Sequence, residues 1–125
     1  MIVIAIVGIL ASVAVPVYQN YLGQAQVMEH LSLAAGLKVS VADLHVDEGA
    51  LDNITNGYKG IQQSSAYRGK YVSQVAVNAG VIAVTMGNQA SNVLSGRALV
   101  LSPLTSEASL SWSCSQSAGT TIQAK

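Results

Sequence analysis

The N-terminal part of the chain is almost wholly apolar. Its first 17 residues read MIVIAIVGILASVAVPV, and no charged residue occurs before Glu29. As a helix, residues 1–17 would extend about 26 Å. A bilayer core requires roughly 20 apolar residues, so this run is short by about one helical turn. Nothing within this segment covers its own apolar surface, so it needs either lipid or copies of itself.

The apolar run passes without a break into an amphipathic pattern, which predicts one helix from Met1 to about His45. Beyond residue 26 the apolar residues recur at helical spacing, and we expect this stripe to pack on the sheet that follows. The expected members of the stripe are Val27, Leu31, Ala34, Ala35, Val41 and Leu44. The opposite face is assigned the polar residues Glu29, Ser32, Lys38 and Ser40.

After the helix the pattern predicts a connecting loop and four short strands. Residues 47–68 carry turn signals and no sustained periodicity, apart from a possible short strand or helical turn. Alternating residues then predict strands at Lys70–Asn78, Val81–Met86, Arg97–Ser102 and Ser109–Ser115. Asn78-Ala79-Gly80 should form a hairpin turn, and Pro103 should end the third strand.

These elements define an α+β fold class, in which a long N-terminal helix packs on a four-stranded antiparallel sheet. We divide the chain into an apolar helix (1–26) and a globular head (27–125). Within the head we expect a helix (27–46), a loop (47–68), a sheet (69–115) and a C-terminal loop (116–125).

Tyr18 and Tyr21 lie three residues apart, directly after the apolar run. Aromatic residues at this position are typical of the interface where a membrane helix leaves the bilayer. A cleaved signal peptide is the alternative, but it would begin with positive charge and end at a small-residue cleavage site. The start is uncharged, and a cut after Ala14 would place Pro16 beside it, so the pattern favours a retained helix.

The segment MIVIAIVGILASVAVPVYQNYLGQAQ resembles the N-terminal helix of mature type IV pilins. Gly8, Pro16, Tyr18 and Tyr21 stand at the spacing of that family, and the match is specific over about 26 residues. The N-terminal Phe and the Glu of the family are absent. This difference suggests that Met1 is an internal residue of the mature protein and that the chain is trimmed by about one and a half helical turns.

The resemblance implies a structural subunit that polymerises through its N-terminal helix into a pilus used in attachment, twitching motility or DNA uptake. It implies storage in the inner membrane, then an extracellular filament of identical copies. The implied partners are a platform protein, an ATPase, a prepilin peptidase and an outer-membrane secretin, with DNA or a host surface as further candidates. No enzymatic activity and no cofactor are expected.

Residues of the apolar helix are expected to form the filament core. They are Ile2, Ile4, Ile6, Ile9, Leu10, Val13, Val15, Val17, Tyr18 and Tyr21. Gly8 and Pro16 mark a helix-breaking segment, because glycine weakens a helix and proline removes a backbone donor and clashes with the preceding turn. We expect the stretch between them to lose regular helix in the filament.

Two other interpretations are compatible with the same pattern. The first is a pseudopilin of a type II secretion system, or a minor pilin that primes or tips a fibre. The second is a membrane-tethered binding module that works as a monomer, such as a DNA-uptake receptor. Abundance and electron microscopy separate them from a major pilin, which is the bulk component of a long fibre.

The composition suits a subunit buried in an assembly, because 50% of the residues are hydrophobic and only 10% are charged. The net charge of +0 supplies no bulk attraction to nucleic acid. The few charges are segregated along the sequence. We expect an acidic and a basic stretch to lie near each other across, or at the edge of, a subunit contact, with Asp43, Asp47, Glu48 and Asp52 facing Lys59, Arg68 and Lys70. The alternative is that the two stretches are solvated faces of one domain.

No residue pattern indicates catalysis or metal binding. His30 and His45 lie fifteen residues apart on the helix and do not converge. Asp43, His45 and Asp47 stand at the helix end, where charged groups usually face water. No glycine-rich loop cradles a nucleotide, and no serine or cysteine has a base at a recognisable spacing.

Cys114 is the only cysteine, and its strand places it on one face with Leu110 and Trp112. Trp112 is expected in the core. The resemblance implies that Cys114 is one half of a disulfide that closes a C-terminal loop, with the second cysteine missing from a chain trimmed after Lys125. A buried free thiol is the alternative.

Overall fold

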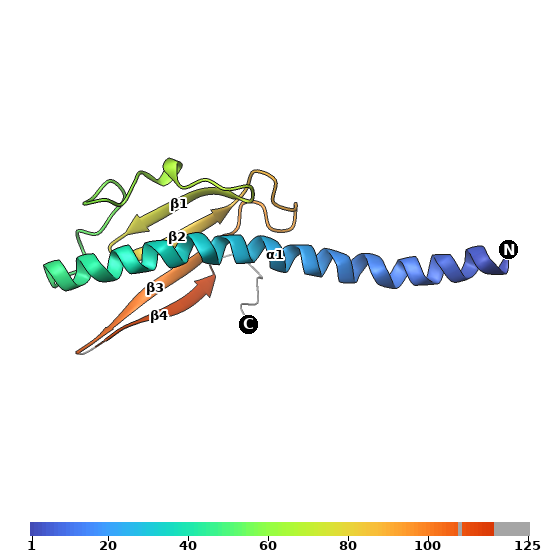
Figure 1. The fold of residues 1–125 in the computed structure, drawn as a ribbon, viewed down its shortest axis with the longest axis horizontal. Coiled ribbons are helices and arrows are strands. Elements are labelled where there is room, and N and C mark those ends of the chain that lie inside the picture. The colour runs from blue at the N-terminus through green and yellow to red at the C-terminus, as the bar shows by residue number, and fades with distance from the viewer. Residues whose placement is uncertain (108, 117–125) are drawn as a thin grey trace.

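A computed structural model describes residues 1–107 and 109–116 of the chain. It consists of one helix, α1 (Ile2–Glu48), a short 3-10 helix, η1 (Ser64–Ala66), and four strands. The strands are β1 (Val72–Asn78), β2 (Val81–Met86), β3 (Ala98–Ser106) and β4 (Ser109–Gln116). They form one antiparallel sheet in the order β1-β2-β3-β4. The second half of α1 crosses the face of this sheet, and the first half projects beyond it (Figure 1).

α1 is one continuous helix of 47 residues, and it runs through Pro16. It ends at Gly49, whose left-handed backbone (φ 71°) lets its N–H donate to the carbonyl of His45 at 2.8 Å. The predicted single helix is confirmed. In the isolated chain, Pro16 costs about 3 kcal/mol locally without interrupting the helix on either side.

The face of α1 that packs on the sheet differs from the predicted stripe. The buried residues are Gln26, His30, Ala34, Leu37 and Val41, at spacings of four, four, three and four. Ala34 and Val41 are as predicted, whereas Leu31 and Ala35 are exposed. The prediction misplaced the stripe because it considered apolar residues only. Two of the buried residues, Gln26 and His30, are polar and form hydrogen bonds inside the fold.

Each of those two polar residues makes one hydrogen bond inside the fold, although the other ring nitrogen of His30, Nε2, is buried without a partner among the described residues. The side-chain oxygen of Gln26 accepts the N–H of Ser91 at 3.1 Å. The ring nitrogen Nδ1 of His30, which is 0% exposed, donates to the carbonyl of Gln26 at 2.5 Å. Burial of a polar group is tolerated when such bonds replace those to water.

The β1–β2 hairpin forms as predicted. Ala79 (φ 49°) and Gly80 (φ 77°) adopt the positive φ angles that a tight two-residue hairpin turn requires. β2 has its predicted limits. β1 starts two residues later than predicted, with an irregularity in its pairing between Val72 and Gln74.

The prediction that Pro103 ends the third strand is wrong, since β3 continues to Ser106. The last residue of β3 that pairs with β2 is Leu101, and beyond it β3 pairs with β4 alone. Pro103 therefore lies where β3 has become an edge strand, and edges tolerate a missing backbone donor.

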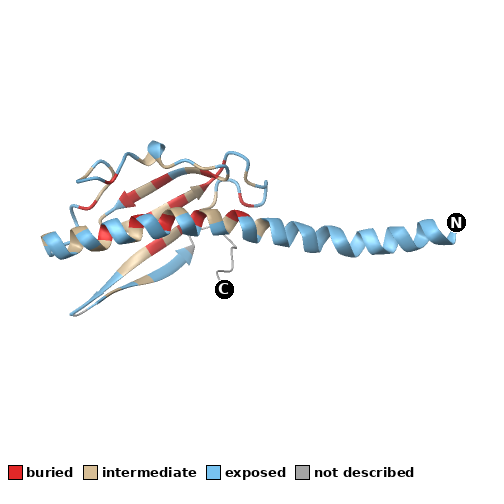
Figure 2. Ribbon diagram, in the orientation of Figure 1, coloured by how far each residue is buried: buried red, intermediate tan, exposed pale blue. Residues whose placement is uncertain are grey.

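Alternate residues of the sheet meet the buried stripe of α1 to form the main core. Its sheet members are Val72, Val75, Val77, Ile82, Val84 and Leu101. Ile54 and Ile61 anchor the connecting loop to the same core, and Trp112 packs against it from β4 while half-buried. The buried residues lie where α1 crosses the sheet (Figure 2).

Candidate polymerisation surface

The first half of α1 is entirely exposed. Every residue from Met1 to Leu22 is exposed, and the large apolar side chains range from 39% exposure at Leu22 to 102% at Met1. Figure 2 shows this half as a bare rod beyond the head. Because burial of one Val, Leu or Ile contributes about 1.5–3 kcal/mol, such a rod strongly favours any apolar surroundings. By length and composition, α1 is able to cross a membrane.

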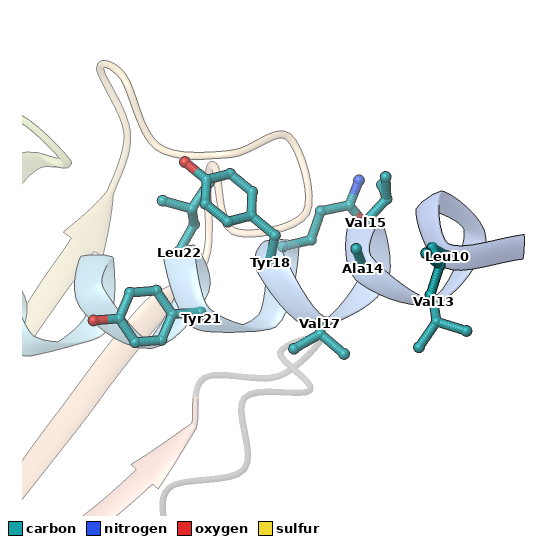
Figure 3. A pocket seen from close by; sticks show the side chains of 9 residues that line it. Leu10, Val13, Ala14, Val15, Val17, Tyr18, Tyr21 and Leu22 are labelled. Atoms are coloured by element: carbon teal, nitrogen blue, oxygen red, sulfur yellow. The ribbon is translucent and has the colours of Figure 1, made fainter. Parts of the chain in front are cut away.

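An open apolar surface surrounds this rod just before it reaches the head. The residues that form it all belong to α1: Leu10, Val13, Ala14, Val15, Val17, Tyr18, Gln19, Tyr21 and Leu22. In Figure 3, Tyr18 lies beside Leu22, whereas Val13 and Val17 point to the other side of the helix. One helix alone forms this surface, so it is open to another apolar partner and is not an enclosed pocket.

A second exposed apolar set continues along α1 beside the head, and we call it the outer stripe. It consists of Met28, Leu31, Ala35, Val39 and Val46. At 3.6 residues per turn these positions share one side of the helix, opposite the stripe that packs on the sheet. The prediction that polar residues occupy this side is wrong. In fact, Glu29, Ser32, Lys38 and Ser40 flank the outer stripe.

One acid and one base of the predicted subunit contact meet within the chain. Lys59 Nζ lies 2.7 Å from Glu48 Oε1, and the Tyr58 hydroxyl donates to the same oxygen at 2.6 Å. The bonds from Lys59 and Tyr58 lower the pKa of the Glu48 carboxyl below its ordinary value. The bond to Glu48 in turn raises the pKa of Lys59. This cluster fastens the connecting loop to the end of α1.

The remaining charges of that prediction are not brought together in one chain. Asp43 and Asp47 lie in the last turns of α1, and Asp52 follows them. Arg68 and Lys70 precede β1 at the opposite end of the sheet, on the side from which the bare rod projects. A contact between these two groups would therefore join different subunits, and it stays a prediction.

Cys114 and Trp112 share a face of β4, as the sequence predicted. Cys114 pairs with Leu101 and Trp112 with Pro103 across β3. Lys38 Nζ of α1 lies 5.6 Å from the centre of the Trp112 ring, within cation–π range. Cys114 is exposed, so the alternative of a buried thiol does not describe it.

The disulfide of Cys114 stays a prediction, because the sequence contains no second cysteine with which it could pair. The expected result is a mature protein whose Cys114 resists alkylation under non-reducing conditions and reacts after reduction. Closing a loop of about 15 residues would contribute about 3 kcal/mol. Mass spectrometry decides this, and a freely alkylated Cys114 in the mature protein would contradict it.

In the part of the chain that the structure describes, no group of three or more His, Cys, Asp or Glu residues is arranged to hold a metal ion. His30 lies inside the head, and His45 lies in the last turn of α1. The chemistry that the surface does offer is apolar association along the bare rod and the outer stripe.

A folded α+β head carried on a bare apolar helix defines a class of proteins that insert into lipid or bundle with their own copies. Comparison with known proteins specifies the class. Residues 23–125 match the pilin family model, which describes a bacterial filament protein. The chain is 42% identical over 117 residues to the type IV major pilin protein PilE of Neisseria gonorrhoeae, covering 93% of this chain and 70% of that protein.

A second relative is the fimbrial protein EcpC of Eikenella corrodens, 38% identical over 125 residues, covering 94% of this chain and 78% of that protein. The solution structure of the major type IV pilin PpdD from enterohemorrhagic Escherichia coli has the same fold. It superposes with a TM-score of 0.60 at 23% identity, covering 79% of this chain and 74% of that one. The chain therefore belongs to the type IV pilin family.

Proposed function

We propose that the chain is the major structural subunit of a type IV pilus and that it polymerises through its N-terminal helix. The observation that carries the proposal is the complete exposure of residues 1–22 on an otherwise well-packed protein. The fibre would lie outside the cell and serve surface attachment, twitching motility or DNA uptake. In this proposal the protein is structural and not an enzyme.

Before assembly, the bare rod would hold the subunit in the inner membrane. Lipid and the helix bundle bury the same apolar residues, so the two states are close in their hydrophobic contribution. Extraction from lipid exposes this apolar surface before the bundle covers it, so the transfer requires an external source of energy. This requirement is what the platform protein, the ATPase and the secretin of a pilus assembly machine would meet, with the prepilin peptidase acting on the precursor.

Within the filament, we propose that the stretch between Gly8 and Pro16 loses regular helix. Each residue that becomes extended adds about 1.8 Å of length, taking rises of about 3.3 Å for a strand and 1.5 Å for a helix. The isolated chain keeps the helix intact, so the change would accompany packing. A filament map showing continuous helical hydrogen bonds over residues 11–15 would contradict it.

The proposal is tested by placing one charge in the rod. Val13→Asp would bury an unpaired carboxylate in the bundle, at a cost of several kcal/mol. We expect fibres to disappear from electron micrographs while the head keeps its circular dichroism spectrum and thermal unfolding. Val93→Asp is the matched control, because Val93 is 69% exposed on a loop of the head. Normal fibres from the Val13→Asp strain would refute the proposal.

Mass spectrometry of purified fibres separates the alternatives. A major pilin is the bulk of the fibre mass. A minor pilin or a secretion pseudopilin would be present in traces, and a tethered receptor would remain in the membrane fraction as a monomer.

A further inference from the structure

The charges of the head are sorted along the axis of α1. The end next to the bare rod carries Arg68, Lys70 and Arg97, which we call the basic edge. Among the described residues, Glu29 is the one acidic residue placed there. The far end holds the acidic residues Asp43, Asp47, Glu48, Asp52 and Glu107, with Lys59 bound to Glu48. A chain with so few charges thus presents opposite signs at its two ends.

Backbone pairing fixes the basic edge. The start of β1, the end of β2 and the start of β3 lie at the same end of the sheet, where the strands begin or finish. The carbonyl of Lys70 accepts the N–H of Gln89 at 3.0 Å, and the carbonyl of Arg97 accepts the N–H of Met86 at 2.8 Å. The three basic residues are therefore held together by the fold.

Contacts with α1 set the height of this edge along the helix. Ser91, in the loop between β2 and β3, bonds to Gln26, and Gly69 lies against the carboxylate of Glu29. The other end of the sheet lies near the C-terminal end of α1, where the N–H of Gly80 donates to the carbonyl of Ile54, in the loop that follows the helix, at 3.1 Å. The strands therefore run lengthwise along α1, and the basic edge is the end nearest the rod (Figure 1).

This height is close to where a bilayer surface would lie. Tyr18 and Tyr21 end the apolar rod and suit the interfacial aromatic belt. Gln26 and Glu29 follow Tyr21 by five and eight residues, which is about 7.5 and 12 Å along a helix. The Debye length at physiological salt is about 8 Å, so a backbone level with Glu29 lies beyond one such length, and it is the long Arg and Lys side chains that can extend their charges toward the surface.

We infer that the basic edge contacts anionic phospholipid headgroups while the subunit is stored in the membrane. Arg68 and Lys70 are exposed and Arg97 is half-buried, and all three stand beside the point where the chain enters the bilayer. Cationic residues next to a membrane anchor add to its affinity for an anionic leaflet. The contact would seat the head against the membrane and would be broken on extraction. The inference rests on the proposed membrane stage.

The acidic end of another copy is the competing partner for the basic edge. Lipid is favoured because the edge is the part of the head nearest the apolar rod, so every inserted subunit brings it toward the membrane surface without any further association. Contact with another copy requires a filament, and it is therefore made one outcome of the test.

The test uses the full chain in nanodiscs of phosphatidylcholine, with or without phosphatidylglycerol. A fluorophore at Asn92→Cys, an exposed position of the β2–β3 loop, is placed in a Cys114→Ser background. It reports on the head through quenching by lipids spin-labelled at the headgroup. We expect stronger quenching with phosphatidylglycerol, and its loss in 1 M salt. Arg68→Gln with Lys70→Gln should weaken docking roughly tenfold to thirtyfold, since each charge near an anionic surface contributes about fivefold.

The matched control is Lys38→Gln with Lys59→Gln, which removes the same charge elsewhere on the head and should leave lipid-dependent quenching in place. Quenching that is independent of phosphatidylglycerol, or unaffected by the Arg68 and Lys70 changes, would overturn the inference and leave the proposed function standing. Failure of the chain to insert into either nanodisc would overturn both. If docking survives in the double variant while its filaments separate at lower salt, the basic edge meets another copy and not lipid.

Discussion

Glu48 joins the end of α1 to the connecting loop through two hydrogen bonds to one oxygen. Its pKa is lowered chiefly by the bond from Lys59, then by the bond from Tyr58. A carboxyl whose pKa is lowered in the folded state adds stability above its unfolded pKa. That stability is lost as the pH falls through the folded pKa. The pH window therefore lies below the ordinary value of 4.5.

We predict that Glu48→Gln reduces the fall in thermal stability between neutral pH and pH 3. The variant should be less stable than the native chain at pH 7, and the difference should shrink as the pH falls below about 4.5. Asp52→Asn, an exposed residue with the same change of charge, should leave the native pH dependence in place. Melting curves across the pH series check this, and parallel curves for the native chain and Glu48→Gln would contradict it.

Packing on the head divides the second half of α1 into a buried side and an exposed side. One side packs on the sheet, and the outer stripe on the other side extends the apolar surface of the rod to Val46. If the rods of neighbouring subunits bundle, the outer stripe is the part of α1 that lies ready to contact them at the level of the heads. Assembly should then depend on residues well beyond the apolar N-terminus.

We predict that Val39→Asp impairs fibre formation without unfolding the head. Val39 is 62% exposed in the subunit, so the head loses little, whereas the filament would have to bury a carboxylate. Ser40→Asp is the control on the neighbouring exposed position. Fibre yield from sheared cells, measured beside the melting temperature, checks the prediction, and equal yields from the two variants would count against it.

The elements were predictable where the local sequence acts alone. The uncharged run specifies the rod, and Asn78-Ala79-Gly80 specifies the hairpin, because the positive φ angles of the turn are a local requirement. The sheet-facing side of α1 was not predictable in the same way. Gln26 is buried only because Ser91, 65 residues away, supplies a donor, and no helical period contains that information.

The position of Pro103 shows the same limit. Its sequence context indicates the end of a strand. However, β2 is too short to pair with β3 at this point, so Pro103 has a neighbour on the β4 side only. The strand can therefore continue through it. The charge prediction depended on the whole fold as well. Lys59 and Arg68 are close in sequence, yet one meets Glu48 and the other lies at the opposite end of the sheet. The sequence identified which residues are charged, and the topology decides which of them meet.

At the scale of the whole molecule, the rod and the head are separable. The buried residues of α1 begin at Gln26, and no residue from 1 to 22 is buried in the head. The family match covers residues 23–125, a range that includes every residue of α1 buried against the sheet. The fold of the head should therefore be independent of the segment that polymerises.

We predict that deletion of residues 1–22 leaves a head that is monomeric without detergent. Its melting temperature should shift by less than the roughly 4 °C that a change of 1 kcal/mol produces in a domain of about 100 residues. Calorimetry and analytical ultracentrifugation check the two parts. A head that unfolds or oligomerises after the deletion would show that the rod contributes to its core.

The side-on attachment of the head to α1 has a mechanical consequence for the proposed fibre. The same segment of chain carries both the bundling surface and the head, and the sheet is attached to its side. A pull along the fibre would then pass from helix to helix through the bundle, and the strands would lie outside the path of the tension. The loops of the head would therefore be free to change in sequence while the tensile strength of the fibre stays the same.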